Sequence, residues 1–314
     1  VLVIVADDHA TSAVGAYGAA HARTPHVDRL ARGGALFRAA SCGNAICGPA
    51  RGTLLTGRHA HATGMTKNLP LTTFDAAQDT FPKRLRAAGY QTAVVGKWHL
   101  GGAPAGFDHS EVLPGQGAYF DPTFVAPDGT KTVRPGYVTD VVTDRAIDWL
   151  KGRDPARPFL LMVHHKGPHS PCEPAPRHLP LYADGPVPEP PTLFAPPTPV
   201  QATARVSVGD DLRPFHLMLD LPRAGLPAAA QAAYAAAYGP ENARFAAAPP
   251  AGRDLVRWKY QRFAKDYLRC VAAVDDGVGR LLDHLADTGA ASDTLVVYTS
   301  DQGFLLGERG WVDK

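Results

Sequence analysis

Four oxygen-bearing side chains stand directly after two apolar segments at opposite ends of the sequence. The run 1–6, Val-Leu-Val-Ile-Val-Ala, is continuous and rich in β-branched residues, as is typical of a strand buried on both faces of a parallel sheet. It is followed by Asp7 and Asp8, and a similar run over 294–300 is followed by Asp301 and Gln302. Ligands of open α/β sheets bind at the carboxyl ends of strands. If the two strands are parallel neighbours, these side chains therefore meet at one sheet edge.

Three carboxylates and one amide oxygen suit a hard divalent cation, Ca²⁺ or Mg²⁺, and suit zinc or copper poorly. The alternative is that an aspartate after a strand only caps a turn or the following helix. A single pair would favour that alternative. Two pairs, each following a buried strand, favour a metal site that is formed by Asp7, Asp8, Asp301 and Gln302.

A cysteine stands two residues before a proline and four before an arginine in Cys47-Gly-Pro49-Ala-Arg51. The segment after Arg51 is expected to be helical, which places Cys47 close to a helix N-terminus. The partial positive charge and free amides of such an end suit an anion. The alternative is a small cysteine buried near a turn, as most isolated cysteines are.

A cation and an imidazole follow a further short strand, in Gly96-Lys97-Trp98-His99. Residues two apart in an extended chain point to the same side. Lys97 and His99 can therefore face one ligand together, with Trp98 directed into the core. The alternative is a solvated lysine beside a histidine satisfied within the core.

Taken together, these segments resemble the type I sulfatases of the alkaline phosphatase superfamily. The resemblance is carried by Cys47-x-Pro49-x-Arg51 with its continuation Leu-Thr-Gly-Arg58, by the loop 96–101 and by the two acidic strand ends. It spans residues 1 to 314 apart from a variable middle. Segments 254–263 and 300–314 are most similar to the bacterial N-acetylglucosamine-6-sulfatase and mucin-desulfating group.

The resemblance implies a modified residue at position 47. In the family, a formylglycine-generating enzyme oxidises the motif cysteine to formylglycine, an aldehyde whose hydrate carries the attacking hydroxyl. The implied substrate is a sulfate monoester on a sulfated carbohydrate, with 6-O-sulfated N-acetylglucosamine as a candidate. The implied cofactor is Ca²⁺ or Mg²⁺.

The resemblance also implies roles for the surrounding residues. Arg51, Lys97 and Lys314 would supply positive charge around the sulfuryl group. His169 and Lys314 would flank the leaving oxygen, with His169 as its general acid, and His99 would take the proton of the second hydroxyl. The chain departs from the group's pattern at Ala50, where serine or cysteine is commoner, and at Arg309, where histidine is common.

The implied fold is α/β: an alkaline-phosphatase-like sandwich with a large, mostly parallel central sheet and helices on both faces. We expect residues 1–314 to form one N-terminal catalytic domain that is truncated at both ends and lacks a C-terminal subdomain. Residues 170–252, rich in proline and alanine, are expected to form a variable excursion beside the substrate. Helices are expected over 24–33, 80–88, 138–150 and 254–285, and a buried strand over 158–163.

Composition is compatible with a soluble enzyme. The 314 residues are 45% hydrophobic, and 32 Lys and Arg against 30 Asp and Glu give a net charge of +2. No basic run with interleaved aromatics favours a nucleic acid as partner, and no apolar stretch approaches the roughly 20 residues of a membrane span. The sequence has no Asn-x-Ser/Thr acceptor, which favours a bacterial source, and the resemblance favours a periplasmic or secreted location.

Two further interpretations stay open at this point. Phosphonate monoester and phosphodiester hydrolases of the same superfamily also use formylglycine and a similar metal site. A degenerate relative could bind sulfated glycan without turnover, although the complete set of expected polar residues speaks against it. A nucleotide pyrophosphatase or phosphomutase would carry threonine or serine in place of Cys47.

Overall fold

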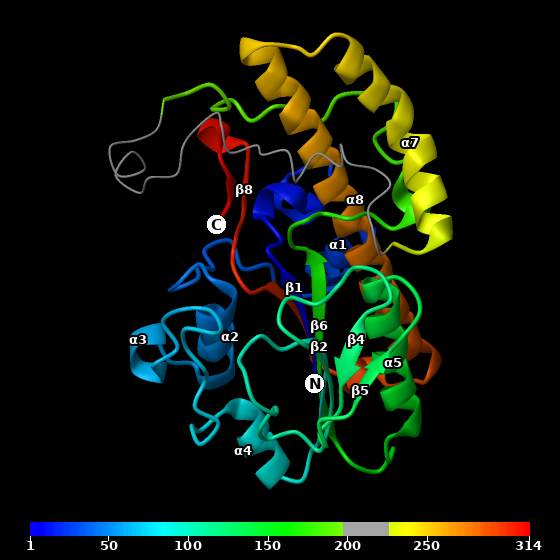
Figure 1. Cartoon of the computed structure of the whole chain (residues 1–314). Coiled ribbons are helices and arrows are strands. Elements are labelled where there is room, and N and C mark those ends of the chain that lie inside the picture. Colours follow the sequence, from blue (N-terminus) through cyan, green and yellow to red (C-terminus); the bar gives the residue numbers. More distant parts are fainter. Residues whose placement is uncertain (197–225) are drawn as a thin grey trace.

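The computed structural model describes residues 1–196 and 226–314, and a twisted sheet runs through their middle (Figure 1). Its strand order is β5-β4-β3-β2-β6-β1-β7, and the five strands from β3 to β7 are parallel, with β4 and β5 antiparallel at one edge. The strands are β1 (Leu2–Asp7), β2 (Gln91–Lys97), β3 (His109–Leu113), β4 (Thr123–Val125), β5 (Lys131–Val133), β6 (Phe159–Pro168) and β7 (Val296–Ser300).

Helices cover both faces of the sheet because successive side chains of a strand point to opposite sides. On β1, Leu2 and Ile4 join one hydrophobic cluster, whereas Val3 and Val5 join another. The first cluster lies against α1 (Pro25–Gly33), α5 (Val138–Gly152) and α8 (Gly252–Asp287), and the second against α2 (Cys47–Thr56) and α4 (Phe81–Ala87) (Figure 1). The predicted α/β sandwich is confirmed.

Shorter elements connect these layers. The helix α3 (Ala60–Thr63) follows α2, and the hairpin of β8 (Leu305–Leu306) and β9 (Val312–Asp313) directly precedes Lys314. Single 3₁₀ turns are formed by Thr11–Ala13, Gly15–Tyr17, Pro176–His178, Ala291–Asp293 and Glu308–Gly310.

The predicted excursion 170–252 lies partly outside the described residues, because 197–225 are not described. Its described part includes α7 (Ala228–Ala247), which lies beside α8 (Figure 1). Polar contacts join the two helices: the buried Tyr238 hydroxyl donates to Asp266 over 2.6 Å, and Arg262 Nη1 donates to the half-buried Glu241 over 2.5 Å. The alanine-rich stretch is therefore a packed helix.

Helix α1 begins where expected but is capped differently from the prediction. Thr24 occupies the N-cap position, yet its side chain makes no capping bond; its hydroxyl accepts from Gly15 N over 2.8 Å instead. The buried carboxylate of Asp275 in α8 accepts from His26 N and Val27 N, over 3.1 and 2.9 Å. A residue about 250 positions away thus satisfies the free amides of this helix end.

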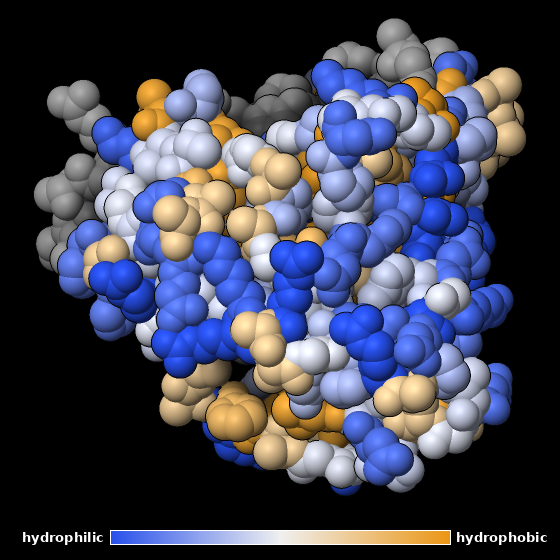
Figure 2. Space-filling view, turned by 90° about the horizontal axis from the view of Figure 1, so that it is seen from below, coloured by the Kyte–Doolittle hydropathy of each residue, from blue (hydrophilic) through white to orange (hydrophobic). Residues whose placement is uncertain are grey.

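The face of the molecule at which the strands begin is mainly polar. Figure 2 views the molecule from the side on which the strands of the sheet begin, and hydrophobic residues form only small groups among hydrophilic ones there. Among the described helices, none has both the length and the apolar composition that crossing a bilayer requires.

Gly96 gives the first prediction, because no other residue fits its backbone. Its φ is +105°, and a Cβ there would lie 2.0 Å from the carbonyl oxygen of His164 on the neighbouring strand. We expect Gly96→Ala to lower the free energy of unfolding by more than about 2 kcal/mol. Gly152→Ala, near the end of α5 and with no atom within 4 Å of the added Cβ, should change it by less than about 1 kcal/mol. Equal urea midpoints for the two variants would contradict this expectation.

Candidate active site

The acidic residues from the two ends of the chain meet at the carboxyl edge of the sheet. Strand β1 lies between β6 and β7, and Ala6 is paired with Ser300, so that Asp7 and Asp301 leave neighbouring strands side by side. Carboxylate oxygens of Asp7, Asp8 and Asp301 all lie within 4.8 Å of one another, and all three residues are buried. The predicted convergence of these carboxylates is what the structure shows.

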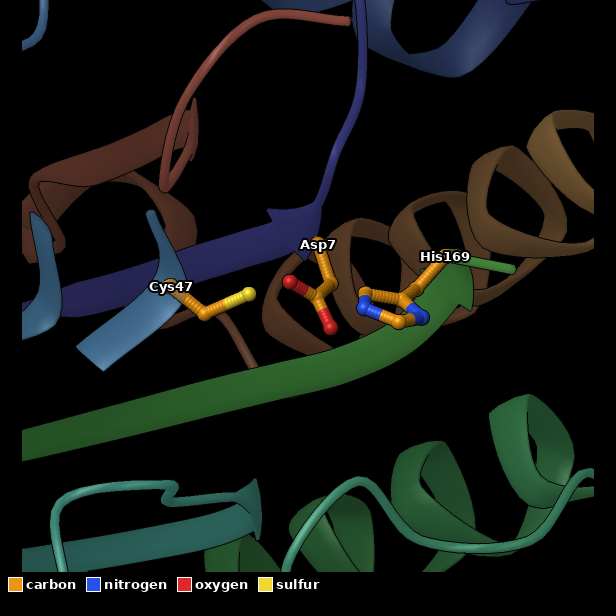
Figure 3. A group of neighbouring side chains, drawn as sticks. All are labelled: Asp7, Cys47 and His169. Atoms are coloured by element: carbon orange, nitrogen blue, oxygen red, sulfur yellow. The ribbon is translucent and has the colours of Figure 1, made fainter. Parts of the chain in front are cut away.

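Cys47 is the first residue of α2, and its side chain is fully buried beside this cluster. Its Sγ lies 3.8 Å from Lys97 Nζ and 3.9 Å from Gln302 Nε2. In Figure 3 the sulfur points toward the carboxylate of Asp7, with the imidazole of His169 on the far side of that carboxylate. Burial, and secondly the charge of Asp7, raise the pKa of the Cys47 thiol to about 12.

The helix end that carries Cys47 is held by Asn68, which the sequence did not single out. The N-cap residue, Ile46, has no side-chain acceptor, and Asn68 Oδ1 accepts from Gly48 N over 2.8 Å in its place. Met65, Asn68 and the His99 carbonyl leave no room for a side chain at Gly48. Asn68 lies in a loop with no recognisable pattern, so nothing in its spacing could have indicated this contact.

Arg51 crosslinks three segments beneath the cluster. Its Nε and Nη2 reach Asp301 Oδ2 over 3.1 and 3.0 Å, and its Nη1 donates to the carbonyl of Lys97 over 2.7 Å. Nη2 also lies 3.6 Å from Asp7 Oδ1. The guanidinium is fully buried, so it can act on the site only from this fixed position.

Three of the predicted polar residues, Gln302, Lys314 and His169, lie around the carboxylate of Asp8. Lys314 Nζ donates to Asp8 Oδ2 over 2.6 Å, and His169 Nε2 lies 3.7 Å from the same oxygen. The amide of Gln302 donates to Asp8 Oδ1. Lys314 and His169 retain a small exposed fraction of their side chains, 13% each, so in the described part of the chain the cluster reaches solvent on this side.

Lys97 and His99 both belong to the site, although the chain between them is not extended as the sequence argument assumed. Strand β2 ends at Lys97, and His99 has a left-handed φ of 57°. Lys97 Nζ forms a buried ion pair with Asp7, and Trp98 is buried in the core as predicted. Burial and then the charges of Lys97 and Arg51 lower the pKa of His99 to about 4. Its Nδ1 has no partner among the described residues.

Strand β6 contributes two further residues below the site. His164 Nδ1 lies 2.9 Å from the carbonyl oxygen of Lys97 and 3.2 Å from Arg51 Nη1, so it packs against both. Lys166 is buried rather than solvated, with its Nζ 4.8 Å from the centre of the Tyr119 ring. Burial, and secondly Lys97, lower the pKa of Lys166 to about 8.

The crowded carboxylates are the physical reason why this cluster fits a cation. Burial and the neighbouring charge of Asp7 raise the pKa of Asp8 to about 6 and hold the pKa of Asp301 well above its usual range. Burial acts in the same direction on Asp7, but Lys97 and then Arg51 outweigh it and hold its pKa well below its usual value. Asp7 Oδ1 and Gln302 Oε1 lack hydrogen-bond partners among the described residues. Buried oxygens without donors suit a hard divalent ion.

Comparison with known proteins identifies relatives over the whole chain. A family model described as Sulfatase matches residues 1–313. The chain is 40% identical to an N-acetylglucosamine-6-O-sulfatase of Bacteroides thetaiotaomicron, in an alignment that covers all of this chain and 60% of that protein. The chain therefore spans about three fifths of the length of this curated relative.

Solved structures give the same result. The chain superimposes with a TM-score of 0.94 and 38% identity on a protein solved in complex with its substrate, D-glucosamine-2-N,6-O-disulfate. The superposition covers 100% of this chain and 67% of that one. A phosphonate monoester hydrolase of Agrobacterium radiobacter superimposes with a TM-score of 0.62 at 22% identity, over 100% of this chain and 64% of that one, which shows a shared fold alone.

Divalent cations should stabilise the protein through this cluster. At a concentration one hundred times its Kd, an ion that binds only the folded state adds about 2.7 kcal/mol to the free energy of unfolding. We expect Ca²⁺ or Mg²⁺, and not Zn²⁺, to raise the Tm of chelator-treated protein. Asp8→Asn should abolish the rise, whereas Asp283→Asn, an exposed carboxylate paired with Arg29, should keep it. A Tm that millimolar Ca²⁺ and Mg²⁺ leave unchanged would contradict the metal assignment.

Proposed function

Because the chain belongs to the sulfatase family, we propose that it hydrolyses sulfate monoesters of a sulfated amino sugar. The observation that carries the proposal is the setting of Cys47: its sulfur lies at a helix N-terminus, against the buried carboxylates and within 4 Å of Lys97 Nζ. A nucleophile in that place meets an anionic ester among fixed positive charges, as charge stabilisation in a transition state requires.

We propose that Cys47 is the precursor of formylglycine, produced by a formylglycine-generating enzyme. The motif Cys47-x-Pro49-x-Arg51 supports this, and the position is buried next to the polar groups that the modified side chain would need. The hydrated aldehyde supplies one hydroxyl for attack on sulfur and a second whose deprotonation releases the bound sulfate. A serine in this place would have no such second hydroxyl.

Asp7, Asp8, Asp301 and Gln302 would hold the divalent cation, for which Ca²⁺ is our first proposal and Mg²⁺ our second. When bound there, the cation would polarise a sulfate oxygen as a Lewis acid and lower the pKa of a nearby hydroxyl. Gln302 presents its amide nitrogen to Asp8 in the structure, and an amide turned by 180° would present Oε1 in the same place. Lys97 and Arg51 compensate the charge of Asp7 and Asp301 from the opposite side.

The cationic side chains would bind the sulfuryl group. The imidazoles would transfer protons to the leaving oxygen and from the hydroxyl at position 47. Lys97 and Lys314 stand on two sides of the acidic cluster, where their ammonium groups can bind the nonbridging oxygens. His169 Nδ1 lies 2.5 Å from Ser170 O, and donation there leaves Nε2 to hold the proton for the leaving oxygen. Burial, and secondly the charge of Lys97, lower the pKa of His169 to about 2 in the free protein. The negative charge of a bound ester would act against this shift and favour the protonated form. Burial lowers the pKa of His99 to about 4, so its imidazole is unprotonated near neutral pH, and its Nδ1 has no hydrogen-bond partner in the described part of the chain. It can therefore accept a proton from the hydroxyl retained at position 47.

The substrate class rests on the relatives. The curated relative is named as an N-acetylglucosamine-6-O-sulfatase, and the solved structure with 38% identity holds D-glucosamine-2-N,6-O-disulfate. We therefore propose a 6-O-sulfated glucosamine, N-acetylated or N-sulfated, as the preferred substrate class.

Replacing the nucleophile precursor tests the reaction. We expect Cys47→Ala to lower kcat for an aryl sulfate by at least about a thousandfold, because the nucleophile is lost. Cys42→Ala, which removes an exposed thiol five residues earlier, should retain activity. Mass spectrometry of the peptide that spans position 47 should show aldehyde in place of thiol in the active protein. Retention of most of the activity by Cys47→Ala would refute the assignment.

A substrate panel tests the reaction class separately. We expect kcat/KM to be higher for 6-O-sulfated N-acetylglucosamine than for the 3-O- and 4-O-sulfated isomers, and lower still for phosphonate monoesters and phosphodiesters. A preference for the phosphorus esters would favour the hydrolase alternative. Tight binding of the sulfated sugar with no release of sulfate, by protein shown to carry the aldehyde, would favour a binding protein.

A further inference from the structure

A tyrosine on the long helix α8 is bonded to the backbone turn that carries the acidic pair. Tyr267 is fully buried, and its hydroxyl donates to the carbonyl oxygen of Asp8 over 2.5 Å. The same hydroxyl accepts from Ala10 N over 2.8 Å. A hydroxyl offers one donor and two acceptor positions, so both sides of this turn are bonded to one oxygen atom.

The turn needs such support because Asp8 adopts an unfavourable backbone conformation. Its φ is +68°, which lies in the left-handed region. Any residue that has a Cβ adopts this region at a cost in free energy. In an extended strand, successive side chains point to opposite faces of the sheet. The left-handed Asp8 interrupts that alternation, and the carboxylates of Asp7 and Asp8 thereby reach the same cluster.

We propose that Tyr267 is a positioning residue of the metal centre, whose hydroxyl keeps Asp8 in its left-handed conformation. The proposal rests on the metal-dependent function given above. On the other side of the turn, Asp8 N donates to Asp301 Oδ1 over 3.1 Å, a bond that ties the turn to β7 but depends on one of the ligands itself. Tyr267 fixes the turn independently of the ligand oxygens.

The hydroxyl can be removed without removing the ring. The Tyr267 ring is stacked on Phe304, with centroids 5.5 Å apart, and lies beside Phe263 at 6.1 Å. Tyr267→Phe keeps these contacts and deletes only the two hydrogen bonds to the turn. Tyr260→Phe is the matched control, because Tyr260 is a buried residue of the same helix whose hydroxyl donates to the Pro188 carbonyl over 2.6 Å.

The experiment titrates Ca²⁺ and Mg²⁺ into chelator-treated protein by calorimetry and follows Tm and steady-state kinetics of the same samples. We expect Tyr267→Phe to bind the cation at least tenfold more weakly, with a kcat that rises again at high cation concentration. Tyr260→Phe should lower Tm in the absence of metal but leave the Kd of the cation unchanged.

The outcomes separate this proposal from the proposed function. A Tyr267→Phe protein that is folded and binds the cation with the Kd of the wild type overturns the positioning role, even if its Tm is lower. A wild-type protein that binds neither cation overturns the metal centre, and the role of Tyr267 with it. A weaker Kd in Tyr260→Phe as well would also count against the proposal, because it would show a general effect of loosening α8.

Discussion

The structure depends on a set of buried charged side chains of opposite sign. No single segment of the chain could bury its own charges without the partners from the others. Asp7, Asp8 and Asp301 face Arg51, Lys97 and Lys314, and these six charges come from four distant parts of the chain. Moving a single ion out of water costs several kcal/mol, and removing one partner of a buried pair is strongly destabilising. The apolar strands can therefore bring these carboxylates together only if the cations arrive with them.

Parallel strand order is what makes this arrangement of charges possible. Strand β1 pairs in parallel with β6 on one side and with β7 on the other. The carboxyl ends of these three strands, which are far apart in sequence, therefore bring their polar residues to one place. Helix α2 brings Cys47 and Arg51 to the same edge from the second face of the sheet, and α8 supports it from the first. The site is built between the two layers rather than on either of them.

The features that the sequence predicted were those with a local pattern. Apolar runs before Asp7 and Asp301 indicated strands, and the spacing of Cys47, Pro49 and Arg51 carried the resemblance. The shared edge followed only on the assumption that the two strands are parallel neighbours, which the structure confirms. Contacts between distant segments had no such pattern. The amide of Asn68 at Gly48 and the carboxylate of Asp275 at α1 became visible only in the fold. The left-handed conformations of Asp8 and His99 likewise had no local signal, since neither residue is a glycine.

The separation along the chain between Arg51 and its partner Asp301 has a consequence for biosynthesis. Arg51 and Asp301 are 250 residues apart, an interval that a ribosome translates in roughly 10 to 50 s. During that time Asp301 and β7 do not yet exist, and the enclosure around position 47 is incomplete. The thiol that is fully buried in the folded chain is therefore exposed for a period set by the length of the polypeptide.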